Sequence, residues 1–264
     1  LVADSILWRI PSPLSIVRSS TVETKNTFFL NDFHSWEHET FLSLGALLLL
    51  DNHFTYIHGS QISNFVSPEA QLNNPVHIEG IGRVWLEDVS FFNNHAPQDG
   101  GALFIASYST VPLVFLNHTS FTGNDASSGG AIKLMGNTVV YMSSFVGNRA
   151  LRSGGAMLIT GATACTIDSI FQDNTAAENG GSIVSFAASL FIEGSTFVRN
   201  RATTGKGGAI AVVQKQILII KDSTFTNCRA IDGGAISTEA VGLHLTESLP
   251  SSTFSFLINQ CDFT

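Results

Sequence analysis

Residues 121–134 read FTGNDASSGGAIKL, and residues 145–159 read FVGNRALRSGGAMLI. The two stretches share Phe-x-x-Asn-x-Ala, a short variable segment, and then Gly-Gly-Ala with an aliphatic residue. Working outward, the same pattern occurs six times between Asp88 and Ile236, with intervals of 30, 24, 26, 26 and 28 residues between successive Phe positions. A repeat of this length indicates a solenoid or another repeat architecture.

The repeated positions are occupied by the same residue types in nearly every copy. The Phe positions are Phe91, Phe121, Phe145, Phe171, Phe197 and Phe225. The Asn positions are Asn94, Asn124, Asn148, Asn174 and Asn200, with Cys228 in the sixth copy. The glycine pairs begin at Gly100, Gly129, Gly154, Gly180, Gly207 and Gly233, and Ser182 replaces one of the following alanines.

The residues after each glycine pair alternate between apolar and variable, as in Ile132-Lys133-Leu134, which is the period of a β-strand. No segment of the repeat has the period or the caps of a helix. Propeller blades need about 40 residues and four strands. We therefore predict an all-β fold, a right-handed parallel β-helix of about six to ten coils with an irregular N-terminal segment.

Stacked coils lie about 4.8 Å apart, so a residue type that recurs once per coil forms a ladder of like side chains. We expect the Phe rings to stack in the interior and the Asn amides to pass hydrogen bonds from coil to coil. We also expect the Asn positions to tolerate left-handed backbone geometry and the glycine pairs to supply positive φ at a corner.

The ends of the chain follow the pattern less closely. We expect residues 1–46 to form an irregular flanking segment or cap and residues 47–264 to form the β-helix, with clear repeats over 88–236. Phe54 is taken as the Phe of a weaker first coil, and Phe263 as that of a last coil over 253–264. Residues 240–252 are expected to be an inserted loop. The incomplete last coil predicts that the chain is part of a longer repeat protein.

The Phe-x-x-Asn and Gly-Gly-Ala-Ile/Leu/Met elements resemble the repeats of the polymorphic outer membrane proteins of chlamydiae and of other large microbial surface proteins. The resemblance covers Asp88 to Ile236, and it departs from the pattern at Cys228 and Ser182. It implies a β-helical passenger on the cell surface that acts in adhesion or surface structure. The chlamydial proteins also have a C-terminal membrane barrel, a segment that this sequence does not show.

A second apolar position lies six residues before each ladder Phe. We call this set the outer row: Trp85, Phe115, Val139, Cys165, Phe191, Ile219 and Leu257. The residues on either side of it are also largely apolar, and alternate strand residues face opposite sides of a sheet. One interpretation is that the outer row is covered by the N-terminal segment, the inserted loop or another molecule. The other is a shift of register or a tolerated exposed strip.

Composition limits the classes of partner. A formal net charge of −8 disfavours nucleic acid and anionic membranes, and the longest apolar run, Phe41–Leu50, is too short for the about 20 residues of a membrane-spanning helix. Cys165, Cys228 and Cys261 are too dispersed for a disulfide framework or a zinc site. Asn117-His118-Thr119 is a glycosylation sequon, so Asn117 is a candidate glycan site.

Two groups of residues are candidates for catalytic chemistry, and each also has a purely structural interpretation. His34-Ser35-Trp36-Glu37-His38 matches a zinc-peptidase pattern, but that pattern requires a helix and lies here in a short polar stretch. Many β-helices are polysaccharide lyases or glycoside hydrolases, which need clustered acids with a nearby base. Asp88, Asp168 and Asp222 recur three residues before a ladder Phe without such partners, so we interpret them as turn residues.

These observations favour a non-catalytic extracellular or cell-surface protein, an adhesion module or structural scaffold that assembles laterally. We expect no catalytic, metal or cofactor site, and a protein, a glycan or a second copy as partner. The alternative is a carbohydrate-active enzyme of the β-helix type. An acidic groove would favour the enzyme, and a covered outer row would favour the scaffold.

Overall fold

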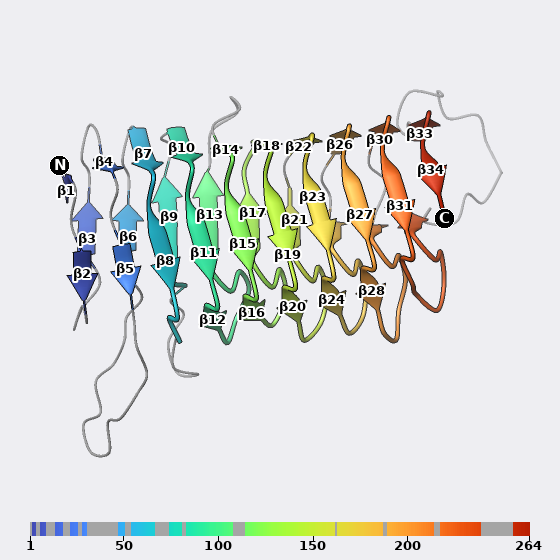
Figure 1. Cartoon of the computed structure of the whole chain (residues 1–264), viewed down its shortest axis with the longest axis horizontal. Coiled ribbons are helices and arrows are strands. Elements are labelled where there is room, and N and C mark those ends of the chain that lie inside the picture. Colours follow the sequence, from blue (N-terminus) through green and yellow to red (C-terminus); the bar gives the residue numbers. More distant parts are fainter. Residues whose placement is uncertain are drawn as a thin grey trace, which may run out of the picture.

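The computed structural model is an all-β solenoid built from parallel strands (Figure 1). It describes residues 2–3, 6–8, 14–17, 22–25, 28–30, 47–50, 54–66, 74–80, 83–107, 114–161, 163–186, 189–213, 217–238 and 256–264. Within these ranges every segment is strand, turn or irregular, and the strands form four sheets along the solenoid axis. The predicted parallel β-helix is therefore confirmed.

Each sheet takes one short strand from successive coils. Sheet A contains β1 (Val2–Ala3), β4 (Val22–Lys25), β7 (Phe54–His58), β10 (Arg83–Glu87), β14 (Val114–Asn117), β18 (Thr138–Tyr141), β22 (Thr163–Ile167), β26 (Ser189–Glu193), β30 (Leu218–Lys221) and β33 (Phe256–Asn259). Sheet B contains β2 (Ile6–Trp8), β5 (Phe28–Leu30), β8 (Gln61–Ser63), β11 (Ser90–Phe92), β15 (Ser120–Thr122), β19 (Ser144–Val146), β23 (Ile170–Gln172), β27 (Thr196–Val198), β31 (Thr224–Thr226) and β34 (Asp262–Phe263).

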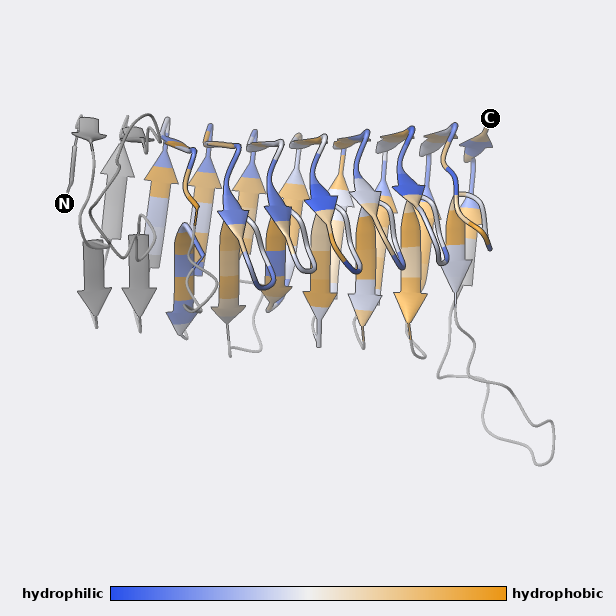
Figure 2. Cartoon of the chain, turned by 90° about the horizontal axis from the view of Figure 1, so that it is seen from below, coloured by the Kyte–Doolittle hydropathy of each residue, from blue (hydrophilic) through white to orange (hydrophobic). Residues whose placement is uncertain are grey.

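The other two sheets complete the cross-section. Sheet D contains the two-residue strands β12 (His95–Ala96), β16 (Asp125–Ala126), β20 (Arg149–Ala150), β24 (Thr175–Ala176) and β28 (Arg201–Ala202). Sheet C contains β3 (Leu14–Val17), β6 (Leu47–Leu50), β9 (Val76–Gly80), β13 (Leu103–Ser107), β17 (Ile132–Met135), β21 (Met157–Thr160), β25 (Ile183–Phe186), β29 (Ile210–Val213) and β32 (Ile236–Thr238). A full coil thus has four strands. The long strands are mainly hydrophobic and the short segments between them mainly hydrophilic (Figure 2).

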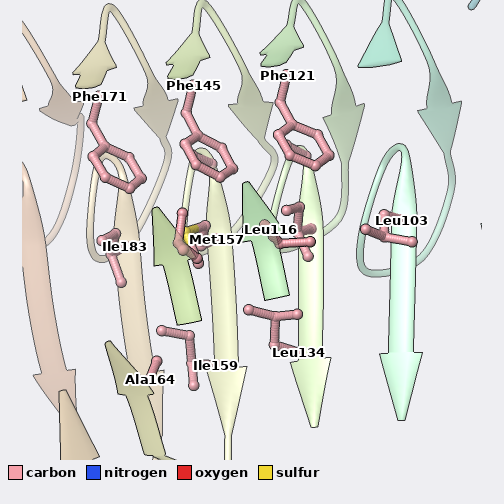
Figure 3. Packing of buried hydrophobic residues seen from close by; sticks show 14 of the residues in the cluster. Leu103, Leu116, Phe121, Leu134, Phe145, Met157, Ile159, Ala164, Phe171 and Ile183 are labelled. Carbon is pink, nitrogen blue, oxygen red and sulfur yellow. The ribbon is translucent and has the colours of Figure 1, made fainter. Parts of the chain in front are cut away.

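The Phe ladder forms the centre of the core. Successive rings of the ladder have centroids 4.7–4.9 Å apart and lie nearly parallel to one another. The ladder consists of Phe91, Phe121, Phe145, Phe171, Phe197 and Phe225. Figure 3 shows the rings of Phe121, Phe145 and Phe171 stacked above aliphatic side chains of sheets A and C. All six side chains are buried. Each contributes about 1.5–3 kcal/mol from burial and about 0.5–1.5 kcal/mol from ring stacking.

The Asn ladder satisfies its own buried polar atoms. The Nδ2 of Asn124 donates to Oδ1 of Asn148, 3.0 Å away, and to the backbone oxygen of Phe91, 3.1 Å away. The same Oδ1 of Asn148 also accepts from the backbone N–H of Asn124. Asn148, Asn174 and Asn94 repeat this arrangement. At the far end, Asn200 Nδ2 lies 4.0 Å from the Cys228 thiol, which continues the ladder as a weaker partner.

A second polar ladder, not predicted from the sequence, lies two residues before the ladder Phe residues from Phe121 to Phe225. Backbone N–H groups donate to the hydroxyl of the next coil, from Ser143 to Ser169 at 3.1 Å and from Ser169 to Ser195 at 3.2 Å. Each hydroxyl in turn donates to a carbonyl two residues earlier, as Ser169 does to Ile167 at 2.8 Å. The turn between sheets A and B is therefore hydrogen-bonded from coil to coil.

Positive φ occurs at the three corners of the coil. Asp88, Asp168 and Asp222 have φ of 53°, 48° and 47° at the corner between sheets A and B, which agrees with a turn role. At the next corner the residue with positive φ precedes the ladder Asn, as in Asn93 and Gly123, so the left-handed geometry occurs in the turn of the ladder Asn but one residue before it. A ladder Asn must keep its amide in line with the next coil, and the turn is made one residue earlier.

The two glycines of each pair are required for different reasons. The first, such as Gly129 with φ +59°, makes the predicted left-handed corner. The second, such as Gly155, has ordinary φ, but an added Cβ would lie 2.0 Å from the backbone oxygen of Gly181. Only glycine allows consecutive coils to approach so closely at this point.

The N-terminal coils differ from the sequence pattern in one respect. Phe54 does not hold the Phe position, because it lies in sheet A opposite Arg83; Ile62 stands opposite Phe91 and fills the ladder instead. Five strands, β1 to β5, fall within residues 1–46 and pair in parallel with later coils. At the other end the ring of Phe263 stacks on Phe225 at 5.0 Å. His34, His38 and residues 240–252 lie outside the described residues.

Candidate functional site

The outer row of sheet A is the candidate site because its side chains leave the core while their strand neighbours enter it. Val84 and Leu86 are 3% and 0% exposed, whereas Trp85 between them is 37% exposed. The same alternation occurs around Phe115, Phe191 and Ile219, which are half-buried. The row is in register from coil to coil, from Tyr56 opposite Trp85 to Ile219 opposite Leu257. Sheet A is thus apolar on both faces.

The N-terminal half of the outer row is aromatic. The rings of Trp85 and Phe115 stack with centroids 5.0 Å apart, and Tyr56 precedes them in the register. Such a stack is a rigid apolar surface, since neither ring can turn freely without losing contact with the other.

A polar edge borders this aromatic half. Glu87 accepts hydrogen bonds from the Tyr56 hydroxyl at 2.8 Å and from Asn117 Nδ2 at 3.0 Å. The hydrogen bond from Tyr56 lowers the pKa of the Glu87 carboxyl, with smaller contributions from Asn117, His58 and His118, while burial opposes them. His58 Nδ1 lies 3.8 Å from Glu87 and 3.7 Å from Asp88. These bonds hold neighbouring coils together across the face of sheet A.

The C-terminal half of the outer row is aliphatic apart from Cys165 and Phe191. Val139, Cys165, Phe191 and Ile219 are all half-buried. Burial, and secondly the Glu193 carboxylate, raises the pKa of the Cys165 thiol. The backbone of Leu257 is in register with Ile219, and its side chain lies outside the description.

Three candidates could cover the outer row: the N-terminal segment, the inserted loop and another molecule. Strands β1 and β4 of the N-terminal segment extend sheet A as further strands, so these described parts of the segment do not lie across the row. The inserted loop lies outside the described residues. The third cover, a second molecule, is taken up as a proposal below.

The sequon residue Asn117 lies on strand β14 beside the outer row. Its side chain is half-buried, its Nδ2 donates to Glu87, and Thr119 of the same sequon is 1% exposed. A glycan on Asn117 would therefore replace the hydrogen bond to Glu87. Glycosylation stays a prediction from the sequence.

Other candidate residues lie apart from one another. Cys165, Cys228 and Cys261 are free thiols at different positions of the coil. Asp125 and Arg149 stand opposite each other without forming an ion pair, and Asp125 Oδ2 instead lies 2.8 Å from His95 Nδ1. Over the described ranges no group of three or more His, Cys, Asp or Glu side chains could hold a metal ion. In the same ranges no helix is long and apolar enough to cross a membrane.

With this geometry established, comparison with known proteins gives one match. Residues 88–106 match the family model of the Chlamydia polymorphic membrane protein repeat. The match covers the first of the six copies, from the turn before Phe91 through the glycine pair to strand β13, and it confirms the resemblance seen in the sequence. No curated protein and no solved structure matches the chain. The repeat type and the fold fit a surface β-helical repeat protein.

Proposed function

We propose that this chain is a non-catalytic scaffold at the cell surface that assembles laterally through the outer row of sheet A. The observation that carries the proposal is the row itself, an in-register line of half-buried apolar side chains on a flat sheet. A contiguous exposed apolar strip of this kind marks an interaction surface in soluble proteins. The repeat family matched at residues 88–106 supports the surface location and the non-catalytic role.

A second copy is the occupant that fits best. Two flat sheets can align along their lengths, so that each coil of one molecule contacts a coil of the other at about the same 4.8 Å spacing. The aromatic half and the aliphatic half would both be covered in such a contact, and the interface core would be apolar, as in homodimers.

The test is the change Phe191→Asp in the complete chain. A carboxylate in the middle of the row would have to be buried without a partner on assembly, so the association constant should fall at least tenfold. Sedimentation equilibrium over a range of concentrations measures this constant for the parent chain and the variant.

Thr196→Asp is the matched control, because Thr196 lies in the same coil and is half-buried on the outer face of sheet B. We expect it to assemble like the parent. A parent chain that stays monomeric at all concentrations, or an equal loss in both variants, contradicts lateral assembly through sheet A.

A further inference from the structure

Sheet D carries a line of exposed basic side chains that the proposed function does not use. The outward position of its strands is occupied, coil by coil, by His95, Asp125, Arg149, Thr175, Arg201 and Arg229. The inward neighbours are buried alanines, such as Ala150 at 2% exposure. The strands of this sheet form a row along one edge of the solenoid (Figure 1). We call Arg149, Arg201 and Arg229 the arginine column.

The three guanidinium groups are not neutralised by neighbouring acids. Other cations in this region are paired: Arg199 with Asp173 at 2.7 Å, Arg152 with Glu178 at 3.6 Å and Lys206 with Asp232 at 3.9 Å. Arg149, Arg201 and Arg229 are exposed, and the described residues offer none of them an ion pair. Their charge is therefore directed to the solvent.

The arrangement is unfavourable for the isolated fold. Arg201 and Arg229 stand directly opposite each other in parallel register, and like charges at such positions repel. The inward alanines, not the arginines, supply the packing of these strands. A bound anion would turn this repulsion into attraction for both groups.

The geometry points to an extended sulfated polysaccharide, bound along sheet D parallel to the solenoid axis. A guanidinium group presents a planar fork of donors that matches a sulfate bidentately. Arg149 and Arg201 are two coils apart, about 10 Å, with the hydroxyl of Thr175 between them, and Arg229 follows one coil further. The line thus places one hydroxyl between the first two guanidinium groups and sets the second and third guanidinium groups in adjacent coils, which suits a ligand with several sulfates along its length.

Apolar side chains next to the arginine column fit the same ligand. Leu151 and Ile231 lie two residues after Arg149 and Arg229 and are 52% and 74% exposed. Sugar rings present C–H faces between their charged substituents, and these side chains offer contacts for them. A net charge of −8 opposes any polyanion, so the exposed Leu151 and Ile231, which suit C–H faces of sugar rings, are what favour a sulfated polysaccharide over a nucleic acid.

The test measures binding of a fluorescein-labelled heparin fragment to the complete chain by anisotropy at low salt. In the variant Arg149→Gln/Arg201→Gln/Arg229→Gln, affinity should fall at least tenfold, and the dependence of affinity on salt should become shallower. Arg83→Gln is a control with the same change per residue, since Arg83 is exposed on sheet A and lies away from sheet D. It should bind within twofold of the parent.

The folded state of the triple variant is checked by circular dichroism and by its melting temperature, which should be unchanged or raised because the repulsion is removed. Chemically desulfated heparin should bind at least tenfold more weakly than heparin. The assignment would be overturned if the triple variant bound heparin as tightly as the parent does. It would also be overturned if the parent bound desulfated heparin, or DNA of the same length, as tightly as heparin. The polysaccharide site and lateral assembly are on different sheets, so each experiment can fail without the other.

Discussion

Sheets A and C both carry outward apolar side chains, and over the described residues three of those in sheet C are buried whereas those in sheet A are not. In sheet C, Leu158, Val184 and Ala211 are 5%, 0% and 2% exposed although they point away from the core. In the same coils, Val139, Cys165 and Phe191 of sheet A stay half-buried. Both rows are in register from coil to coil, but that of sheet C also holds Lys133 and Ser237, so the comparison concerns these three coils.

The turn that carries the glycine pair makes the difference. A Cβ on Gly129 would lie 2.9 Å from Leu158 Cβ, and one on Gly154 would lie 2.8 Å from Val184 Cγ1. Gly129 and Gly154 therefore lie directly against Leu158 and Val184, and their turns contribute to the burial of these two side chains. Among the described residues no glycine turn lies against the outer row of sheet A, whose side chains stay half-buried. In this fold, an outward apolar row therefore indicates an interaction surface only where the chain itself does not bury it.

The largest effect is expected when the cover of sheet C is removed. In Gly154→Val the side chain would meet the Met157 oxygen and Val184 while the backbone keeps a φ of +69°. The turn cannot stay in place, and the loss of unfolding free energy should be about 4 kcal/mol or more. Urea unfolding followed by circular dichroism measures this loss.

Gly147→Asn serves as the control for that change. Gly147 has φ +63° with open space around it, and Asn93 and Asn227 occupy the same position in other coils. The variant should stay within about 0.5 kcal/mol of the parent. If Gly154→Val were as mild as this, the glycine turn would not act as a cover.

A smaller loss of unfolding free energy is expected from a Val→Asp substitution, which can be made in both rows because each contains a valine. Val184→Asp places a carboxylate where the side chain is fully buried and should cost about 3 kcal/mol or more. Val139→Asp places the same group in the half-buried row of sheet A and should cost about 1 kcal/mol. Urea unfolding at a concentration below assembly compares the two; equal losses would mean that the row of sheet A is already covered within one molecule.

The smallest effect concerns the thiol within the outer row. Burial and the Glu193 carboxylate raise the pKa of Cys165, so less thiolate is present at pH 8 than in the unfolded chain. Alkylation of Cys165 by iodoacetamide, followed by peptide mass spectrometry, should be a few-fold slower in the folded chain and should accelerate as the pH approaches the raised pKa. It should slow further at concentrations that favour assembly. Labelling as fast as in urea would show that the row is fully open.

The repeat was sufficient to predict most of the interior. Six copies of Phe-x-x-Asn and Gly-Gly-Ala indicated strands, coils and stacked rings, because a constant period places each residue type over itself. The serine ladder was missed although Ser143, Ser169, Ser195 and Ser223 stand two residues before successive ladder Phe residues. Val89 interrupts that signal in the first copy. Phe54 was misplaced because its coil lacks the Asn and the glycine pair that define the register.

The sequence by itself determined the ladders, the sheet pattern and the existence of a second apolar row, since these follow from local period and residue type. Only the tertiary structure decided how far each apolar row is buried, that Asp125 bonds His95 rather than Arg149, and that three aligned arginines form no ion pair with a described acid. The physical reason is that exposure and pairing depend on how one coil's turn lies against its neighbour, and the spacing of residues along the chain does not contain that distance.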